Sequence, residues 1–419
     1  MNPSSSSGVG AAVSWRALLS TYLPALILST GVGIALPAIP ALANSFHVSF
    51  GVASGVITLF LIGSLAGTIP AGWLIDRFGR RPILIAGPLI IAVAAFGIAQ
   101  TSSFTVLLSL RFVSGFAQQM WLVSRLAAIS HGAAANQRGR QISWMYGSDN
   151  IGRLVGPLVG GFIAANLGIR TAFIAYALLA LIALVPTILL SEDTPRRVWA
   201  PGEANRIAIL QSLRDIIAPR IAYFGVALFA GLTRGPFFAD LFHLYAAYEY
   251  RLGPAQIGYL ATAAAVIALP LAFVAGWLLD NVGRMRTMIP GFIGVALSLA
   301  ALGVSAYLHL NVYWYVALFL LAVTTQSLTG GSVQTIGADV APPKARGTFL
   351  GLWQFTGQGG QTLGPILFAL LADSVSQGAA FVFTASCALV VLLLLVVAIP
   401  RTHANATGDA AAAHGPAPR

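Results

Sequence analysis

The stretch Gly72-Trp73-Leu74-Ile75-Asp76-Arg77-Phe78-Gly79-Arg80-Arg81-Pro82 joins two long apolar runs, residues 53–74 and 82–100. Each run is long enough to cross a bilayer as a helix, which takes about 20 apolar residues. A connection this short makes the two helices antiparallel. Because loops rich in Arg stay on the cytoplasmic side of a membrane, the sequence predicts a cytoplasmic turn here, and Gly79 permits it to be tight.

The same pattern recurs in the second half of the chain, at Gly276-Trp277-Leu278-Leu279-Asp280-Asn281-Val282-Gly283-Arg284. Two unrelated loops would satisfy the positive-inside rule with basic residues alone. They would not need to share the order G-W-L-x-D-x-x-G-R. The repeat therefore indicates that the chain consists of two related halves. Three pairs of matching residues have the same separation in sequence: Gly72 with Gly276, Asp76 with Asp280, and Gly79 with Gly283.

At these residues the sequence resembles the major facilitator superfamily of secondary transporters, whose signature loop lies between the second and third helices. The matching residues are Gly72, Asp76, Arg77, Gly79, Arg80 and Arg81. The resemblance implies that this turn is a conformational latch, with Asp76 near the start of the eleventh helix when the cytoplasmic side is closed. It implies the same role for Gly276, Asp280, Gly283 and Arg284 in the second half.

Composition supports a membrane protein. Hydrophobic residues make up 57% of the 419 residues and charged residues only 8%, where a soluble domain has about 25%. The net charge of +11 would suggest a nucleic-acid partner in a soluble protein. Most of the Lys and Arg residues lie in the expected cytoplasmic segments; only Arg170 and Arg251 lie on the exterior side, and four arginines lie inside expected helices. The positive-inside rule explains this distribution, and no nucleic acid is expected.

The sequence offers no support for catalysis or for a cofactor. Cys387 is the single cysteine, which excludes an intrachain disulfide and a cysteine-based metal site. Lys344 is the single lysine and does not lie in a phosphate-binding G-x-x-x-x-G-K-[ST] loop. H-E-x-x-H and G-x-S-x-G motifs are absent. We expect no enzyme activity, no metal, and a proton gradient as the source of energy.

The apolar runs predict twelve transmembrane helices, with both termini in the cytoplasm. We expect a disordered N-terminus over 1–15, a six-helix bundle over 16–190, a cytoplasmic linker over 191–218, a second bundle over 219–400 and a disordered tail over 401–419. The fold class is therefore an all-α membrane protein. The resemblance implies two parallel six-helix repeats with a site near the midplane. The expected helices are 16–42, 53–74, 82–100, 104–130, 139–166, 169–190, 219–246, 255–279, 287–307, 312–337, 346–372 and 378–399.

Ionisable side chains inside a bilayer are costly and usually face a cavity or a partner. In the expected helix 104–130, Arg111 and Gln118 lie on one stripe, and Arg111 resembles the arginine linked to proton transfer in proton-coupled members. The alternative makes Arg111 a structural cation bonded to backbone carbonyls. Arg125 lies near the cytoplasmic end, where we expect it to extend to the membrane surface. Gln326 corresponds to Gln118 in the second half, and both are expected in the substrate cavity.

The expected helix 139–166 carries Asp149 and Arg153 one turn apart, in the favourable order for an ion pair. Asp149 lies near mid-membrane, so the pair either carries a coupling proton or is a permanent internal ion pair. The residues that follow resemble the G-x-x-x-G-P-x-x-G-G signature of the drug/proton antiporter branch, whose members are exporters. They are Gly152, Gly156, Pro157, Gly160 and Gly161, of which Gly152, Gly156 and Gly160 also form a stripe for close helix packing.

Residues 230–240 hold a second group of charges. Gly235 and Pro236 should interrupt the helix near its centre, and broken helices often line transporter sites. Arg234 would meet an anionic group, and Phe237 and Phe238 an apolar one. Asp240 is a second proton-coupling candidate, although an ion pair between Arg234 and Asp240 is an equal alternative.

The sequence thus predicts a proton-coupled exporter of small amphipathic compounds, acting as a monomer in the bacterial inner membrane. An organic-anion or metabolite carrier is the alternative, because arginines outnumber acids inside the expected helices. A receptor or scaffold without transport is less consistent with the repeated turn and the charges inside the membrane.

Overall fold

The computed structural model describes residues 22–132, 138–190, 220–342 and 346–398. The expected termini and linker lie outside these ranges. Within them the chain is almost entirely helical, and ten helices are long and apolar enough to cross a membrane. Two more polar helices, α7 and α16, bring the number of spans to twelve and confirm the predicted fold class.

The first six spans form one bundle, in which α2 packs against α7 and α8, and α6 packs against α4 and α5. The helices of this N-half are α2 (Leu23–Ala35) with α3 (Ala38–Asn44), α4 (Phe50–Phe78), α5 (Arg80–Gln100), α6 (Phe104–Gly132), α7 (Arg138–Asn166) and α8 (Ile169–Leu190).

The last six spans repeat this arrangement, with α10 against α16 and α13 between α14 and α17. The helices of this C-half are α10 (Ile221–Phe238) with α11 (Leu241–Glu249), α12 (Pro254–Asn281), α13 (Arg284–Tyr307), α14 (Val312–Leu328) with α15 (Ser332–Val340), α16 (Arg346–Ser374) and α17 (Gln377–Leu393), which ends in the π-helical turn η4 (Leu394–Ala398).

The two repeated turns have the same backbone geometry. Gly79 separates α4 from α5 with φ of 89°, and Gly283 lies before α13 with φ of 102°. A residue with a Cβ is strained at such angles, which explains why both turns carry glycine at this point. The predicted tight turn is therefore present in both halves.

Three spans are broken into two helices. Pro37 lies between α2 and α3. The seventh span breaks at Asp240, whose φ is 53°, rather than at Gly235-Pro236 as predicted; α10 continues through Pro236 to Phe238. The break between α14 and α15, where Gly331 has φ of 76°, was not predicted, because residues 312–337 were assigned to one helix although Thr329-Gly330-Gly331-Ser332 lies within them.

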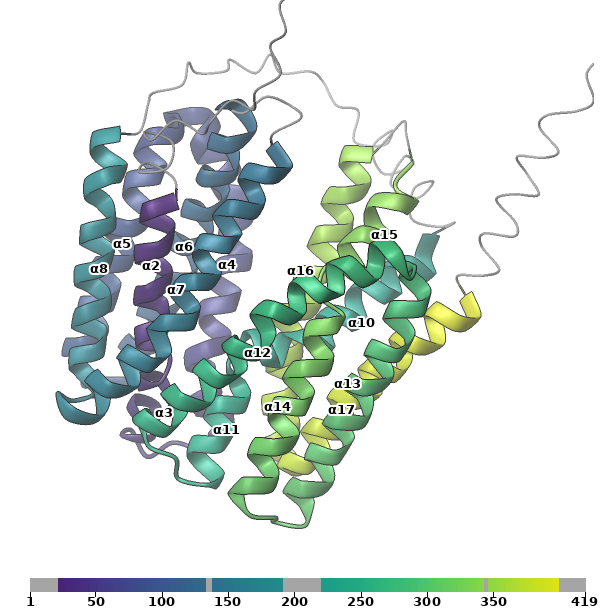
Figure 1. Cartoon of the computed structure of the whole chain (residues 1–419). Coiled ribbons are helices and arrows are strands. Elements are labelled where there is room, and N and C mark those ends of the chain that lie inside the picture. Colours follow the sequence, from purple (N-terminus) through teal and green to yellow (C-terminus); the bar gives the residue numbers. More distant parts are fainter. Residues whose placement is uncertain (1–21, 133–137, 191–219, 343–345, 399–419) are drawn as a thin grey trace, which may run out of the picture.

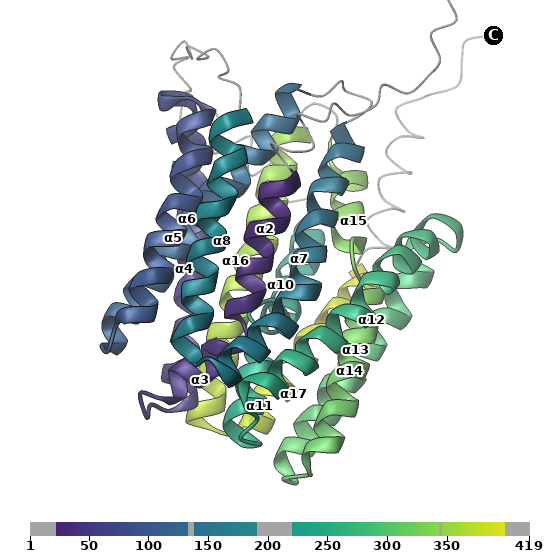
Figure 2. The same ribbon diagram turned by 60° about the vertical axis from the view of Figure 1, so that its left-hand side comes forward.

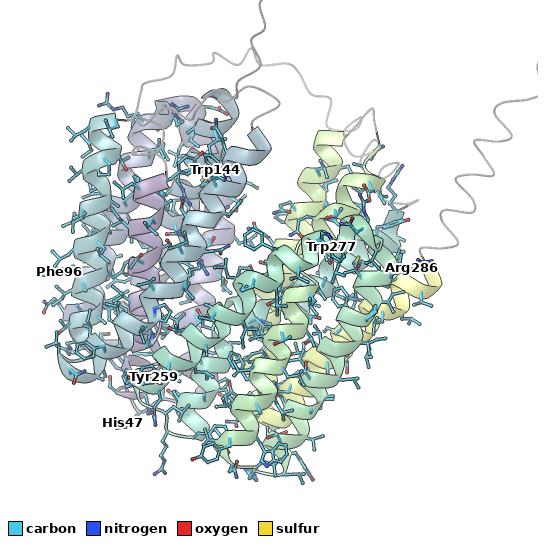
Figure 3. The ribbon with its side chains drawn as sticks, viewed as in Figure 1. His47, Phe96, Trp144, Tyr259, Trp277 and Arg286 are labelled. Carbon is cyan, nitrogen blue, oxygen red and sulfur yellow. The ribbon has the colours of Figure 1, made fainter. Side chains whose placement is uncertain are left out.

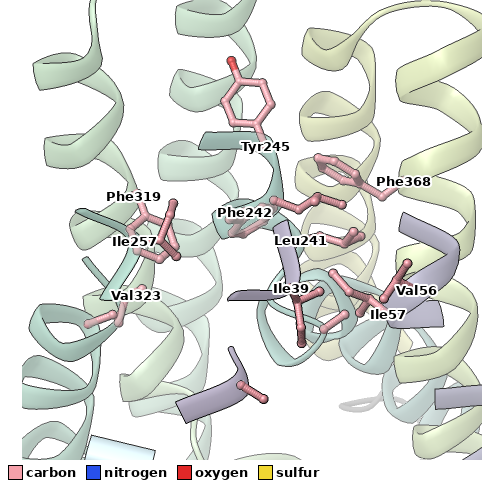
Figure 4. Packing of buried hydrophobic residues seen from close by; sticks show 14 of the residues in the cluster. Ile39, Val56, Ile57, Leu241, Phe242, Tyr245, Ile257, Phe319, Val323 and Phe368 are labelled. Carbon is pink, nitrogen blue, oxygen red and sulfur yellow. The ribbon is translucent and has the colours of Figure 1, made fainter. Parts of the chain in front are cut away.

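The two halves meet at one end of the molecule and diverge toward the other (Figures 1 and 2). We call the end that carries the Gly79 and Gly283 turns the basic end. The opposite end, with α3, α11 and the starts of α4 and α12, is the sealed end. Helices α4 and α16 pack against one another across the halves, and so do α7 and α12. A buried apolar cluster joins the halves near the sealed end, with Val56 of α4, Phe242 of α11 and Phe368 of α16 among its members (Figure 4).

Exposed aromatic side chains lie toward both ends of the bundle. Trp144 and Trp277 are 46% and 60% exposed and lie toward the basic end, while Tyr259 lies toward the sealed end (Figure 3). Amphipathic aromatic rings are enriched at the two surfaces of a membrane. Their placement agrees with a bundle whose helices run from one membrane surface to the other.

Candidate functional site

The N-half contains a buried ion pair between α6 and α7. The Arg125 guanidinium donates Nη1–H to Oδ1 of Asp149 at 3.2 Å and Nη2–H to Oδ2 at 3.0 Å. It also lies over the Trp121 ring, 3.7 Å from the centroid. Arg125 is only 3% exposed and Asp149 17% exposed. Both oxygens of the carboxylate are thus held by one rigid, buried cation.

This geometry corrects two predictions. Asp149 does not pair with Arg153, which is exposed and makes no ion pair in the described part of the chain. Arg125 does not extend to the membrane surface. The local spacing favoured Arg153, but stacking on Trp121 fixes Arg125 so that its planar fork faces Asp149 across the two helices.

Arg111 has a different environment. Its Nε–H donates to the backbone carbonyl of Val56 in α4 at 2.9 Å, and its guanidinium lies 4.7 Å from the centre of the Phe60 ring. The side chain is buried, and no carboxylate pairs with it among the described residues. These contacts join α6 to α4.

The glycine stripe of α7 packs closely against α2. A Cβ added at Gly156 would lie 2.6 Å from the Cα of Gly33, so the two backbones are in direct contact. Gly152 and Gly160 face Ser29 and Ile34 of α2 in the same way. Gly161, by contrast, faces the C-half, where its nearest neighbours belong to Pro254 and Gly258 of α12.

The described contacts of Arg77, Arg81 and Arg284 in the latch turns at the basic end lie within one half. Asp76 is exposed and has no hydrogen-bond or ion-pair partner within the described ranges. Arg77 lies over the rings of Trp73 and Phe78, and Arg81 donates to the carbonyl of Ile188. The side chain of Asp280 lies outside the described set. Cβ atoms added at Gly72 and Gly276 would meet only open space.

In the C-half, Arg284 forms an ion pair with Asp339 at the end of α15. Both side chains are partly exposed. The pair joins α13 to α15 within one half, so the second turn contributes to the internal structure of the C-half in this conformation.

The sealed end holds a contact that sequence reasoning missed. Asp373, in the last turn of α16, accepts a hydrogen bond from Ser49 Oγ at 2.7 Å and another from the backbone N–H of Gly51 at 2.8 Å. Ser49 is the N-cap of α4, so the carboxylate of one half lies at the helix N-terminus of the other half. Tyr248 donates to the carbonyl of Val48 nearby and packs on Phe50.

The charges of the seventh span do not pair with one another. Arg234 lies over the Phe238 ring at 4.9 Å, whereas Asp240 faces His243 at 3.5 Å, so an Arg234–Asp240 ion pair is not formed. Phe237 packs against Phe242, with ring centroids 4.6 Å apart, and belongs to the apolar core. Of the two predicted aromatic residues, only Phe238 remains exposed and close to the cation.

A small cavity of about 40 Å³ lies beside Arg234, between α10, α15 and α16. Its polar lining consists of Arg234, Gln334, Gln354, Gln358 and Gln361, and its walls include Trp353. The predicted Gln118 and Gln326 do not line it. Each has a buried side-chain oxygen without a hydrogen-bond donor in the described part of the molecule.

The comparisons with known proteins agree with this architecture. The family model described as "Major Facilitator Superfamily" matches residues 21–358 and 237–419. The chain is 30% identical to a chloramphenicol resistance protein of Pseudomonas aeruginosa over 62% of each chain. It is 24% identical to the class B tetracycline resistance protein of Escherichia coli, over 85% of this chain and 87% of that one.

The fold is also shared with solved structures. A D-xylose-proton symporter superposes with a TM-score of 0.74 at 17% identity, covering 93% of this chain and 98% of the symporter. A POT family transporter gives 0.75 at 13% identity, with 92% and 96% covered. With the repeated turn, the two six-helix halves and a family model that matches most of its length, this chain belongs to the major facilitator superfamily.

Proposed function

We propose that the protein is a proton-coupled exporter of small amphipathic compounds that works by alternating access. The observation that carries this proposal is the buried, bidentate Arg125–Asp149 pair on α6 and α7. It lies in a bundle whose halves are closed at one end only. The relatives that this chain resembles are described as resistance proteins for chloramphenicol, tetracycline and multiple drugs, which supports export.

Asp149 is the group we assign to the coupling proton. Protonation would neutralise the carboxylate and remove its charge-assisted bonds to Arg125. Helix α7 also makes the close contacts with α2 and with α12 of the other half. A change in the protonation of Asp149 would therefore act on α7, a helix that forms part of the interface between the halves. Coupling requires that the proton affinity differ between the two conformations, because a ligand shifts an equilibrium only by its differential affinity.

The positive-inside rule orients the molecule with its basic end in the cytoplasm. The conformation described here is then open to the cytoplasm and closed to the exterior. An exporter in this state is ready to take up substrate from the cell interior. We place the protein in a bacterial inner membrane, as a monomer, with small-molecule substrate, protons and lipid as its partners.

The test is transport by purified protein in proteoliposomes, with chloramphenicol and tetracycline as probes. We expect a pH gradient to drive accumulation of at least one probe. In Asp149→Asn, accumulation against the gradient should fall at least tenfold, while exchange down a gradient continues. Ser148→Ala, which removes only a hydroxyl bonded to its own helix, is the matched control.

If Asp149→Asn still concentrates the probe, the coupling proton binds elsewhere. If the variant loses thermal stability and exchange together, the ion pair is structural, and Asp149 has no coupling role.

A further inference from the structure

The cavity beside Arg234 has the chemistry of a binding site for an anionic group. Within the described residues, the Arg234 guanidinium makes no ion pair and no hydrogen bond; its one recorded contact is the Phe238 ring. An arginine inside a membrane protein normally has an anionic or carbonyl partner, because an isolated cation in the membrane is costly. The aromatic ring covers the guanidinium by a cation–π contact and satisfies none of its N–H donors.

None of the described acidic side chains forms an ion pair with Arg234. Asp149 is held by Arg125, Asp339 by Arg284, and Asp373 by the start of α4. The cavity lining itself contains no acid. The site therefore has a net positive charge, which disfavours cationic drugs and favours anions.

Glutamine amides supply further donors around this cation. Gln354, Gln358 and Gln361 are spaced by four and three residues, so they share one face of α16. Gln334 lies on α15, which the break at Gly331 separates from α14. Each amide has two N–H donors, and these side chains form no hydrogen bonds with the described residues.

The cavity has the size of a head group, not of a whole drug. Its volume is about 40 Å³, whereas one water molecule needs about 10–15 Å³ in the same measure. A carboxylate fits this space, while the ring system attached to it would lie outside. The planar fork of an arginine matches the two oxygens of a carboxylate. Trp353 provides an apolar wall next to these polar groups.

Close helix packing fixes the position of Arg234. A Cβ at Gly231 would lie 3.0 Å from the Cα of Gly360, and one at Gly235 would lie 2.5 Å from the carbonyl oxygen of Gln361. The backbones of α10 and α16 are thus in contact on both sides of the arginine. The cation lies about 20 Å along α10 from its start, near the middle of the span.

We propose that this cavity binds the carboxylate of amphipathic organic acids, through Arg234 and the glutamines of α16. The inference rests on the proposed function and gives its substrate class: monoanionic aromatic acids rather than lipophilic cations. The acid enters from the basic end with its carboxylate directed at Arg234, and its apolar part remains between the halves.

The test uses three probes of one shape: 1-naphthoate, neutral 1-naphthamide and cationic 1-naphthylmethylammonium. Binding to the purified full-length protein in nanodiscs is measured by calorimetry. We expect naphthoate to bind at least tenfold more tightly than the other two. Arg234→Gln should weaken naphthoate binding at least tenfold and change naphthamide binding less than twofold. Arg234→Lys, which keeps the charge but loses the fork, should give an intermediate loss.

Arg170→Gln removes an exposed arginine at the start of α8 and serves as the charge-matched control, with no expected effect. The proposal is overturned if naphthoate has no advantage over naphthamide. It is also overturned if Arg234→Gln weakens both probes equally, since the arginine would then be structural. Failure of pH-driven transport in proteoliposomes, with this binding selectivity intact, would count against the exporter and not against the anion site.

Discussion

The carboxylate of Asp373 should control how long the molecule stays closed at the sealed end. It accepts one hydrogen bond from Ser49 Oγ and one from the Gly51 N–H, at the N-terminus of α4. Hydrogen bonds to a charged group contribute about 1.5–3 kcal/mol each in favourable settings, and a charge at a helix N-terminus about 0.3–1 kcal/mol. Asp373 is exposed, so solvent screening reduces these values strongly.

Asp373→Asn keeps one acceptor oxygen and removes the charge. We expect a loss of about 1 kcal/mol in the free energy that favours the sealed conformation, which is roughly a fivefold change in the equilibrium between conformations. Spin labels at Leu167 and Leu308, both exposed and located just beyond the ends of α7 and α13 at the sealed end, report this equilibrium as a distance distribution. The population with the longer distance should rise about fivefold.

Ser374→Ala is the control, because its hydroxyl bonds only to the carbonyl of Leu370 in its own helix. Ser49→Ala removes the other side of the contact and should act in the same direction as Asp373→Asn. An unchanged distribution in both Asp373→Asn and Ser49→Ala would refute the assignment of Asp373 as a lock between the halves.

Two further substitutions test the interface between the halves. Asp76→Asn should leave the sealed end intact, since Asp76 has no described partner in this conformation. It should lower transport and shift the population toward the state open at the basic end. Spin-label distances across the basic end measure this shift, and an unchanged distribution would exclude a latch role. Gly258→Ala should open the sealed end, because a Cβ there would lie 2.5 Å from the carbonyl oxygen of Pro157. The Leu167–Leu308 distance measures this opening, and Gly253→Ala, whose Cβ would make only an ordinary contact at 3.9 Å with Gln256 Oε1, is the control. A Gly258→Ala protein that stays sealed would show that the helices relax instead.

The sequence was sufficient to predict what depends on local pattern. Twelve apolar segments, the repeated turn and its glycines follow from hydropathy and backbone geometry, which neighbouring residues determine. The break at Pro37 falls where proline removes a backbone donor. The break at Gly331 follows Gly330 in a polar segment, and the assignment of one helix over 312–337 did not use this local breaker signal.

Contacts between helices could not be predicted from the spacing of residues within one helix. Asp149 has Arg153 one turn away on its own helix, yet it pairs with Arg125 because Trp121 fixes that guanidinium on the neighbouring helix. Asp373 is a single acid in the last turn of α16, and the local sequence gives it no partner. Only its contact with the other half gives it a role. The glutamine stripe of α16 was visible in the sequence at spacings of four and three, but its relation to Arg234 required the packing of α10 on α16.

Helices α4 and α16 each carry one acid near the C-terminal end, an arrangement that would allow the same pair of helices to form an equivalent contact in either conformation. They lie against each other across the halves, and each carries one acid close to its C-terminal end: Asp76 in α4 and Asp373 in α16. In the present conformation Asp373 is bound to the start of α4, while Asp76 is exposed. We propose that Asp76 approaches the start of α16 when the basic end closes. A rocking motion of one half would then exchange one carboxylate–helix contact for another of the same kind. Because the two contacts are chemically alike, their free energies nearly cancel. We expect the proposed proton at Asp149, or an anion at Arg234, to reverse the small remaining difference.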